Sequence, residues 1–246
     1  MKYKTINKIL IFFVLVMSST QFVAAQGALA IQILPVFNGK PLQLNEKMYR
    51  TENGDSVSIE TFKFYMSSLK LLNDHFIYQE PNSYHLVDAE DSNSLYFKIE
   101  QIPSGIYSSL SFNIGVDSIA SVSGALGGAL DPTFGMYWAW NTGYINAKLV
   151  GSSPSCNTMH HQFEFHIGGY KEPYLMLRKV QIPLRECTIK DGLTQTIILQ
   201  ADIATWFSGI HLTSLNNVVL PSVEALKIAD NYMEMFHDSS NIAEKK

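Results

Sequence analysis

The chain has 246 residues, 46% of them apolar, and its 18 basic and 22 acidic side chains give a net charge of −4. This length fits one large domain or two small ones, and the apolar share is that of a globular protein. An acidic chain has no electrostatic attraction for a phosphate backbone, so the composition argues against nucleic-acid binding.

Residues 1–25 have the pattern of a secretory signal peptide. Lys2, Lys4 and Lys8 precede an unbroken apolar run over residues 9–17, and small residues at 23–25 predict cleavage before Gln26. No cysteine follows the run to accept a lipid, and no later segment has the roughly 18 apolar residues of a membrane span. We therefore expect a secreted or periplasmic protein. Cleavage would remove three of the 18 basic residues and none of the 22 acidic ones, so the mature chain would have 15 basic and 22 acidic side chains and a net charge of −7.

The chain contains two cysteines, Cys156 and Cys187. Outside the reducing cytoplasm an even pair of cysteines is more often a disulfide than two thiols, so we predict a Cys156–Cys187 bridge. The pair lacks the CxxC spacing that lowers a thiol pKa, which argues against redox catalysis.

Strand signals dominate the chain from residue 30 to residue 203. Apolar alternation predicts strands at residues 30–37, 49–72 (with a turn at Asn53-Gly54), 75–80, 84–89, 95–102, 106–116, 144–150, 161–170, 175–184 and 195–203. Residues 122–135 hold four glycines and a proline and predict a long loop. Roughly ten short strands in this pattern predict an all-β sandwich or barrel as a single domain over residues 26–246.

One helix is expected near the C-terminus, over residues 222–236. Ser222 can cap it, and the apolar residues Ala225, Ala229, Tyr232, Met233 and Phe236 fall on one face at helical spacing.

The strongest local signal for chemistry is the sequence MHHQFEFHIGG at residues 159–169. Read as a strand, it places His160, Glu164 and His166 on the face opposite Phe163 and Phe165. Imidazole and carboxylate ligands suit zinc or copper, and the nearby Met159 would add a soft sulfur for copper(I). The alternative is a solvent-facing polar stripe.

Two tryptophans lie one residue apart, Trp138 and Trp140. Read as part of a strand, they share one face and Tyr137 and Asn141 the other. Large aromatics of this kind most often fill a core, and they can also form a platform for a sugar ring.

An acidic loop at residues 88–91 carries Asp88, Glu90 and Asp91 and is a candidate calcium site, although it lacks the spacing of an EF-hand. No nucleophile elbow, HExxH motif or glycine-rich phosphate loop occurs in the chain. We therefore expect a protein without catalytic turnover.

Five segments in order resemble the MbnP-like family of exported copper-binding proteins, which includes surface copper proteins of methane-oxidising bacteria. They are FKFYMSSLKL at residues 62–71, HLVDAEDSNSL at 85–95, IPSGIYSSLSFNIGVD at 102–117, GALDPTFGMYWAWNTGYINAKLVG at 128–151 and FEFHIGGY at 163–170.

The resemblance implies a β-rich fold and an extracytoplasmic copper site built from histidines and a tryptophan oxidised to kynurenine. It further implies a partner, a di-haem cytochrome of the peroxidase type, that performs this oxidation. His166 matches a family histidine position, and Trp138 and Trp140 are the candidates for modification. The stretch SIASVSG has no histidine where many relatives have an Asn-His pair, and Asn141 and Thr142 follow Trp140 where relatives have Trp-x-His.

Together these observations predict an extracytoplasmic metal-binding protein, with copper as the metal. His166 is the first candidate ligand, His160 and Glu164 follow, and His85 is a further candidate beside the acidic loop. The alternatives are a metal-free surface module that binds glycan or peptide, and an envelope interaction protein that docks through its C-terminal helix.

Overall fold

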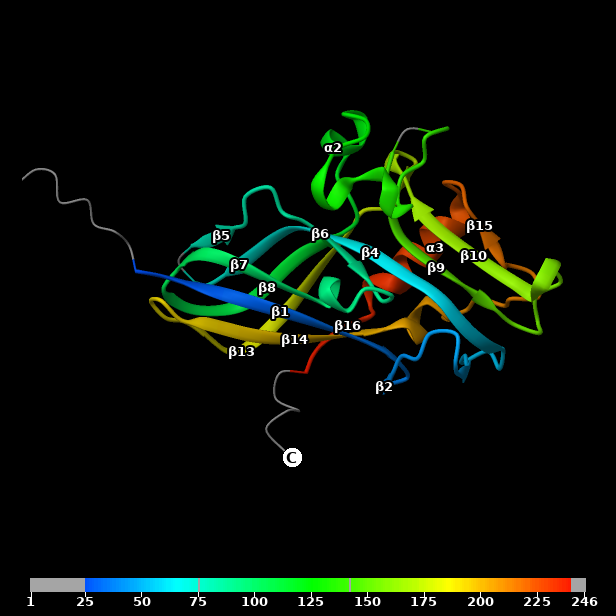
Figure 1. Ribbon diagram of the computed structural model, residues 1–246, viewed down its shortest axis with the longest axis horizontal. Coiled ribbons are helices and arrows are strands. Elements are labelled where there is room, and N and C mark those ends of the chain that lie inside the picture. The colour runs from blue at the N-terminus through cyan, green and yellow to red at the C-terminus, as the bar shows by residue number, and fades with distance from the viewer. Residues whose placement is uncertain (1–24, 75, 142, 240–246) are drawn as a thin grey trace, which may run out of the picture.

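A computed structural model of the protein describes residues 25–74, 76–141 and 143–239. The predicted signal peptide lies outside the described residues, except for Ala25. Two β-sheets and one α-helix make up most of the described chain (Figure 1). The prediction of an all-β fold with a C-terminal helix is confirmed.

The smaller sheet has the strand order β16-β14-β1-β2, and β7 also pairs with β1. Strands β1 and β14 run parallel, with Ile31 opposite Ile197. The bounds are β1 Gln26–Phe37, β2 Lys40–Pro41, β7 Tyr96–Pro103, β14 Thr194–Asp202 and β16 Phe236–Asp238.

The larger sheet has the order β13-β8-β4-β9-β10-β15, and β3, β5 and β6 also pair with β4. The bounds are β3 Met48–Arg50, β4 Ser56–Leu72, β5 Ile77–Gln79, β6 Tyr84–Asp88, β8 Gly105–Ile114, β9 Ile145–Ser152, β10 Gln162–Gly168, β13 Arg178–Ile189 and β15 Asn217–Val218. A separate hairpin joins β11 Tyr170–Lys171 to β12 Tyr174–Leu175.

The main hydrophobic core draws residues from both sheets. Phe62 and Phe64 of β4, Leu149 of β9 and Phe165 of β10 belong to it, together with Ile31 of β1. Because side chains alternate along a strand, the residues between them on β4, β9 and β10 lie on the opposite, outer face of the larger sheet. The candidate site lies on this outer face.

Helix α3 spans Val223–Met233 and begins at the predicted cap, where the Ser222 side chain accepts a hydrogen bond from the Ala225 amide. The helix ends before Phe236, which pairs with Ala201 in the smaller sheet, so the predicted end at residue 236 is wrong. The apolar face of α3 is buried in the main core, which removes it as a free docking face.

The segment between β8 and β9 is folded into short helices over the outer face of the larger sheet, as Figure 1 shows around the label α2. The short helices of the chain are α2 Ser118–Val122, η1 Ser92–Leu95, η2 Gly128–Leu130, η3 Pro132–Phe134, η4 Met159–His161 and η5 Ile203–Phe207. A second hydrophobic cluster lies under this segment and includes Tyr65, Met136, Trp138 and Tyr144.

The predicted disulfide is wrong, because Cys156 and Cys187 are both buried free thiols. Cys156 comes four residues after Ser152, which pairs with Ser58 near one end of β4. Cys187 pairs with Tyr107 of β8, and β8 pairs with the other end of β4 at Leu72. These two ends of β4 are roughly 40 Å apart at 3.3 Å per residue, and a disulfide needs Cα atoms within about 7 Å. The spacing of the two cysteines in the sequence gives no indication of this distance in the fold.

Candidate metal site on the outer face of the larger sheet

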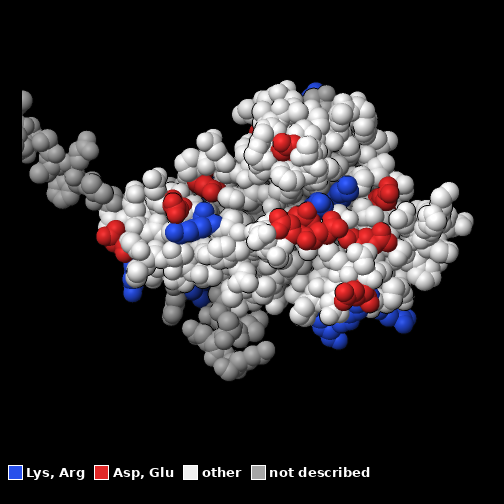
Figure 2. Space-filling view, viewed as in Figure 1, with Lys and Arg blue, Asp and Glu red and all other residues white. Residues whose placement is uncertain are grey.

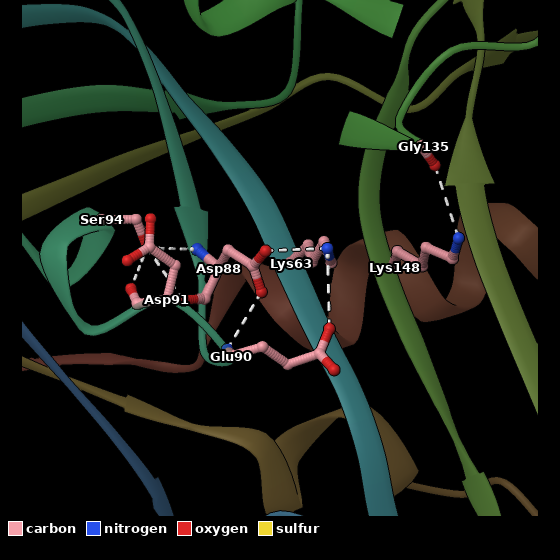
Figure 3. Close-up of polar contacts among 7 residues, drawn as sticks. All are labelled: Lys63, Asp88, Glu90, Asp91, Ser94, Gly135 and Lys148. Atoms are coloured by element: carbon pink, nitrogen blue, oxygen red, sulfur yellow. Dashed lines mark hydrogen bonds and ion pairs between the residues drawn. The ribbon is translucent and has the colours of Figure 1, made fainter. Parts of the chain in front are cut away.

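Four polar residues form a row across four neighbouring strands on the outer face. Asp88 of β6 pairs with Lys63 of β4, Lys63 with Lys148 of β9, and Lys148 with His166 of β10. The Lys63 ammonium makes ion pairs with Asp88 at 2.7 Å and Glu90 at 3.6 Å (Figure 3). In this row Lys63 is therefore neutralised by the carboxylates beside β6, whereas Lys148 on β9 lies next to the imidazole of His166.

His166 occupies the end of this row that lies farthest from the carboxylates. Its Nε2 atom is buried and has no hydrogen-bond partner among the described residues. Burial, and then the positive charge of Lys148, lower the pKa of the imidazole to about 4. The ring is therefore neutral at neutral pH, which is the form that ligates a metal.

Lys148 approaches the segment that covers this face. Its Nζ donates a hydrogen bond of 3.4 Å to the Gly135 carbonyl, away from the Lys63 cluster in Figure 3. Burial, followed by repulsion from Lys63, lowers the pKa of Lys148. Its ammonium still places positive charge beside His166.

Trp138 belongs to the segment that covers the outer face of the larger sheet. A Cβ atom at Gly168 would lie 2.8 Å from the Trp138 ring, so only glycine leaves room for this indole. Gly168 is two residues, or about 7 Å, after His166 on β10, and the pairing with β9 is irregular between Ile167 and Gly168. Trp138 thus packs against β10 two residues beyond His166.

The two tryptophans differ in exposure. Trp138 is 6% exposed and Trp140 is 64% exposed, and their ring centroids are 5.7 Å apart. The prediction that they share a strand face is wrong, because Trp140 lies in a turn that joins Tyr137 to its bridge partner Tyr144. The turn residues of this stretch were not evident from its aromatic alternation.

A cavity of about 230 Å³ is lined in part by Trp138. Its lining also includes Asn141, Tyr170 and Tyr174. The cavity gives small molecules a surface of aromatic and hydrogen-bonding residues.

The histidine-rich stretch is only partly the predicted strand. Strand β10 begins at Gln162, and Glu164 and His166 share its outer face while Phe163 and Phe165 are buried, as predicted. His160 is on the turn η4 before the strand, with a φ of 58°. The prediction that His160 shares a face with His166 is wrong, because the left-handed turn ends the extended backbone.

His85 lies on the opposite face of the larger sheet from His166. It pairs with Met66 of β4, a residue of the main core. Met66 comes three positions after Lys63 on a regular stretch of β4, and an odd spacing places two residues on opposite faces of a strand. The His85 ring stacks on Phe97 with centroids 4.0 Å apart, and its Nε2 lies 2.9 Å from a Glu80 carboxylate oxygen. His85 and His166 are therefore not brought together.

The acidic loop uses its carboxylates within the protein. Asp88 pairs with Lys63 and accepts from the Glu90 amide, and Asp91 accepts from the Asn93 amide at the start of η1. Figure 2 shows a red patch of acidic side chains beside blue basic atoms on this face of the molecule. Among the described residues, no group of three or more His, Cys, Asp or Glu side chains is placed to hold a metal ion.

The lysine row was missed in the sequence. Its signal was present, because Lys63 and Lys148 each interrupt an apolar strand, in FKF and AKL. A single charged residue in such a strand marks the solvent-side face, but the pairing of the two lysines depends on strand register.

The fold and the site define a class: a two-sheet β protein whose larger sheet carries a covered histidine on its outer face. The sequence model of the MbnP family matches residues 26–223, and the chain belongs to that family. MbnP from Methylosinus trichosporium has a similar fold, with a TM-score of 0.51 at 12% identity over 74% of this chain and 78% of that one. No curated protein sequence matches the chain. None of the helices in the described residues has the length and apolarity to cross a membrane.

Proposed function

We propose that this protein binds copper outside the cytoplasm through His166 and has no catalytic turnover. The observation that carries the proposal is the buried Nε2 atom of His166, which has no hydrogen-bond partner among the described residues. A buried polar atom without a partner is costly, and a bound metal ion would satisfy it. The choice of copper rests on the resemblance to the MbnP-like family that the sequence carries, and the family match covers residues 26–223.

The residues present fit a copper ion through one histidine. The neutral imidazole of His166 offers a lone pair, and Glu164 is the next donor on the same strand face. His160 and His85 are elsewhere, so further donors must come from the segment that covers the site. Trp138 of that segment packs against Gly168, two residues after His166 on β10.

We infer that Trp138 is the tryptophan that becomes kynurenine. Indole is a poor metal ligand, whereas kynurenine carries an aromatic amine and a ketone. Two peroxide molecules supply the oxidation: indole plus two H₂O₂ gives the N-formyl product and two waters, and hydrolysis then releases formate. A di-haem cytochrome of the peroxidase type is the proposed partner, and the exposed Trp140 ring, in contact with Trp138, is where it can reach the pair.

Export is part of the proposal. Residues 1–25 have the signal-peptide pattern, and both strand β1 and the family match begin at residue 26. Cleavage before Gln26 would therefore leave the folded domain intact.

The test is the metal content of the protein purified from its native envelope, with the intact mass of the same sample. We expect near-stoichiometric copper in the wild type and in His211→Asn, a matched exposed histidine, and loss of copper in His166→Asn. A mass above that of the unmodified chain by the difference between kynurenine and tryptophan, absent in Trp138→Phe, would support the modification. Absence of copper from the wild type, His211→Asn and His166→Asn alike would overturn the metal function.

The aromatic cavity favours a second candidate function, the binding of a sugar ring. The side chains of Asn141, Tyr170 and Tyr174 line it and make no hydrogen bond to another described residue, so they remain available to ligand hydroxyls. Titration with methyl pyranosides, followed by tryptophan fluorescence, tests it. A change in fluorescence that is lost in Tyr174→Ala would support sugar binding. No change in the wild type would exclude this second function.

A further inference from the structure

The turn before β10 combines three exposed residues with metal-binding side chains. Met159, His160 and His161 form the short helix η4, and Met159 is 80% exposed. Their Cα atoms span at most about 7 Å, since consecutive Cα atoms are 3.8 Å apart. A flexible thioether and two imidazoles thus project from one tight turn.

His161 has its tautomer fixed by the backbone. Its Nδ1 lies 2.9 Å from the carbonyl oxygen of Cys156. A carbonyl oxygen can only accept, so Nδ1 carries the hydrogen and Nε2 keeps its lone pair. A histidine that donates one ring N–H to a carbonyl in this way is oriented as metal-binding histidines are.

The backbone of the turn is unusual. His160 and His161 both have positive φ, at 58° and 57°, a conformation that few side chains other than Asn, Asp and His adopt. Hydrogen bonds hold it in place: the Ser153 amide donates to the His161 carbonyl at 2.8 Å, and the His161 amide to Thr158 at 3.1 Å. Strained residues that a structure holds firmly are often found at functional positions.

We propose that Met159 and His161, with His160 beside them, form a surface site for a soft monovalent cation, copper(I) or its analogue silver(I). Thioether and imidazole donors select copper(I) over hard cations, and two or three donors suffice for it. The site holds no carboxylate, which disfavours calcium and magnesium.

This site is separate from the one at His166. Strand β10 begins at Gln162, immediately after the turn, and its extended backbone from Gln162 to His166 alone spans about 13 Å. The inference therefore stands whether or not His166 binds copper. An exposed site with few donors exchanges its ion readily, as a point of ion capture or transfer would.

The test is a titration of the folded protein with silver nitrate, which avoids redox chemistry, followed by NMR of the methionine methyl and histidine ring signals. We expect the Met159 methyl and the His161 ring to shift together at a stoichiometry of one. Met159→Leu and His161→Asn should each weaken silver binding about tenfold or more, because loss of even a supporting group costs metal affinity 10- to 100-fold. Asparagine tolerates the left-handed backbone, so the turn should persist.

Two matched variants control the result. Met48 is an exposed methionine and His211 an exposed histidine, and neither belongs to the turn, so Met48→Leu and His211→Asn should leave silver binding unchanged. His166→Asn should also leave the Met159 shift unchanged, which separates this site from the proposed copper site. A shift spread over all exposed methionines, or no loss in Met159→Leu and His161→Asn, would overturn the proposal.

Discussion

Lys148 and His166 are direct cross-strand partners on β9 and β10, and the lysine charge helps to keep the histidine neutral. The pairing has two opposed effects on a metal. It leaves the imidazole lone pair free at neutral pH, and it places a positive charge beside the position that a cation would take.

Replacement of Lys148 by methionine should therefore raise both the pKa of His166 and its affinity for copper. At an effective dielectric constant near 20, two unit charges about 5 Å apart repel by about 3 kcal/mol, and solvent lowers this value. We expect an affinity gain of about tenfold. Competition with a copper chelator measures it, with the exposed Lys190→Met as the control. An unchanged affinity would show that Lys148 swings clear of the ion or that copper binds elsewhere.

The lowered pKa of His166 also makes stability depend on pH. In the unfolded chain the imidazole takes up a proton below its ordinary value of 6.5, whereas in the folded protein it does so only near pH 4. Between these values the unfolded chain binds more protons, so the free energy of unfolding falls as the pH falls from 6.5 to about 4. Because the ring is partly solvent-exposed, we expect this loss to be roughly 1–2 kcal/mol.

Urea unfolding at several pH values tests this effect. The wild type and His211→Asn should lose stability in parallel over this range, and His166→Asn should lose less. Equal slopes for all three proteins would mean that His166 titrates in the folded state as it does in the unfolded chain.

Alternation along the chain predicted the strand faces well. Phe163 and Phe165 are buried and Glu164 and His166 face outward because a β-strand has a period of two, whatever its partners are. The Ser222 cap was equally local, since one hydroxyl satisfies an amide three residues away. Local rules were sufficient wherever the backbone stayed regular.

The errors arose where distant segments decide the outcome. His160 leaves the strand because two hydrogen bonds hold a left-handed turn that no local propensity requires: the Ser153 amide donates to the His161 carbonyl, and the His161 amide donates to the Thr158 carbonyl. The separation of Cys156 from Cys187 depends on which end of the long strand β4 each one adjoins. Neither strand order nor register can be read from the spacing of two residues.

The free cysteines should behave as protected thiols. Burial raises the pKa of each to about 11, so neither is ionised at neutral pH in the folded protein. Without reductant, we expect almost no reaction with a thiol reagent under native conditions and two reactive thiols per chain in denaturant. Reductant should leave the Tm unchanged. Thiols that appear only after reduction would instead demonstrate a disulfide.

Gly168 is predicted to be the residue that fixes Trp138 in place. Its backbone does not have a positive φ, so alanine is conformationally acceptable there and any effect of the change is steric. A Cβ would lie 2.6 Å from the Tyr144 carbonyl oxygen and 2.8 Å from the Trp138 ring, and one or both must move.

Gly168→Ala should therefore lower the free energy of unfolding by about 1–3 kcal/mol, as overpacking does, and shift the tryptophan emission as Trp138 becomes exposed. Gly127→Ala is the matched control, because a Cβ there has no atom within 4 Å. Urea unfolding followed by fluorescence measures both effects. Trp206 is fully buried in the main core and should contribute the same emission in all three proteins. If Gly168→Ala unfolds and emits like Gly127→Ala, then Trp138 does not rest on β10.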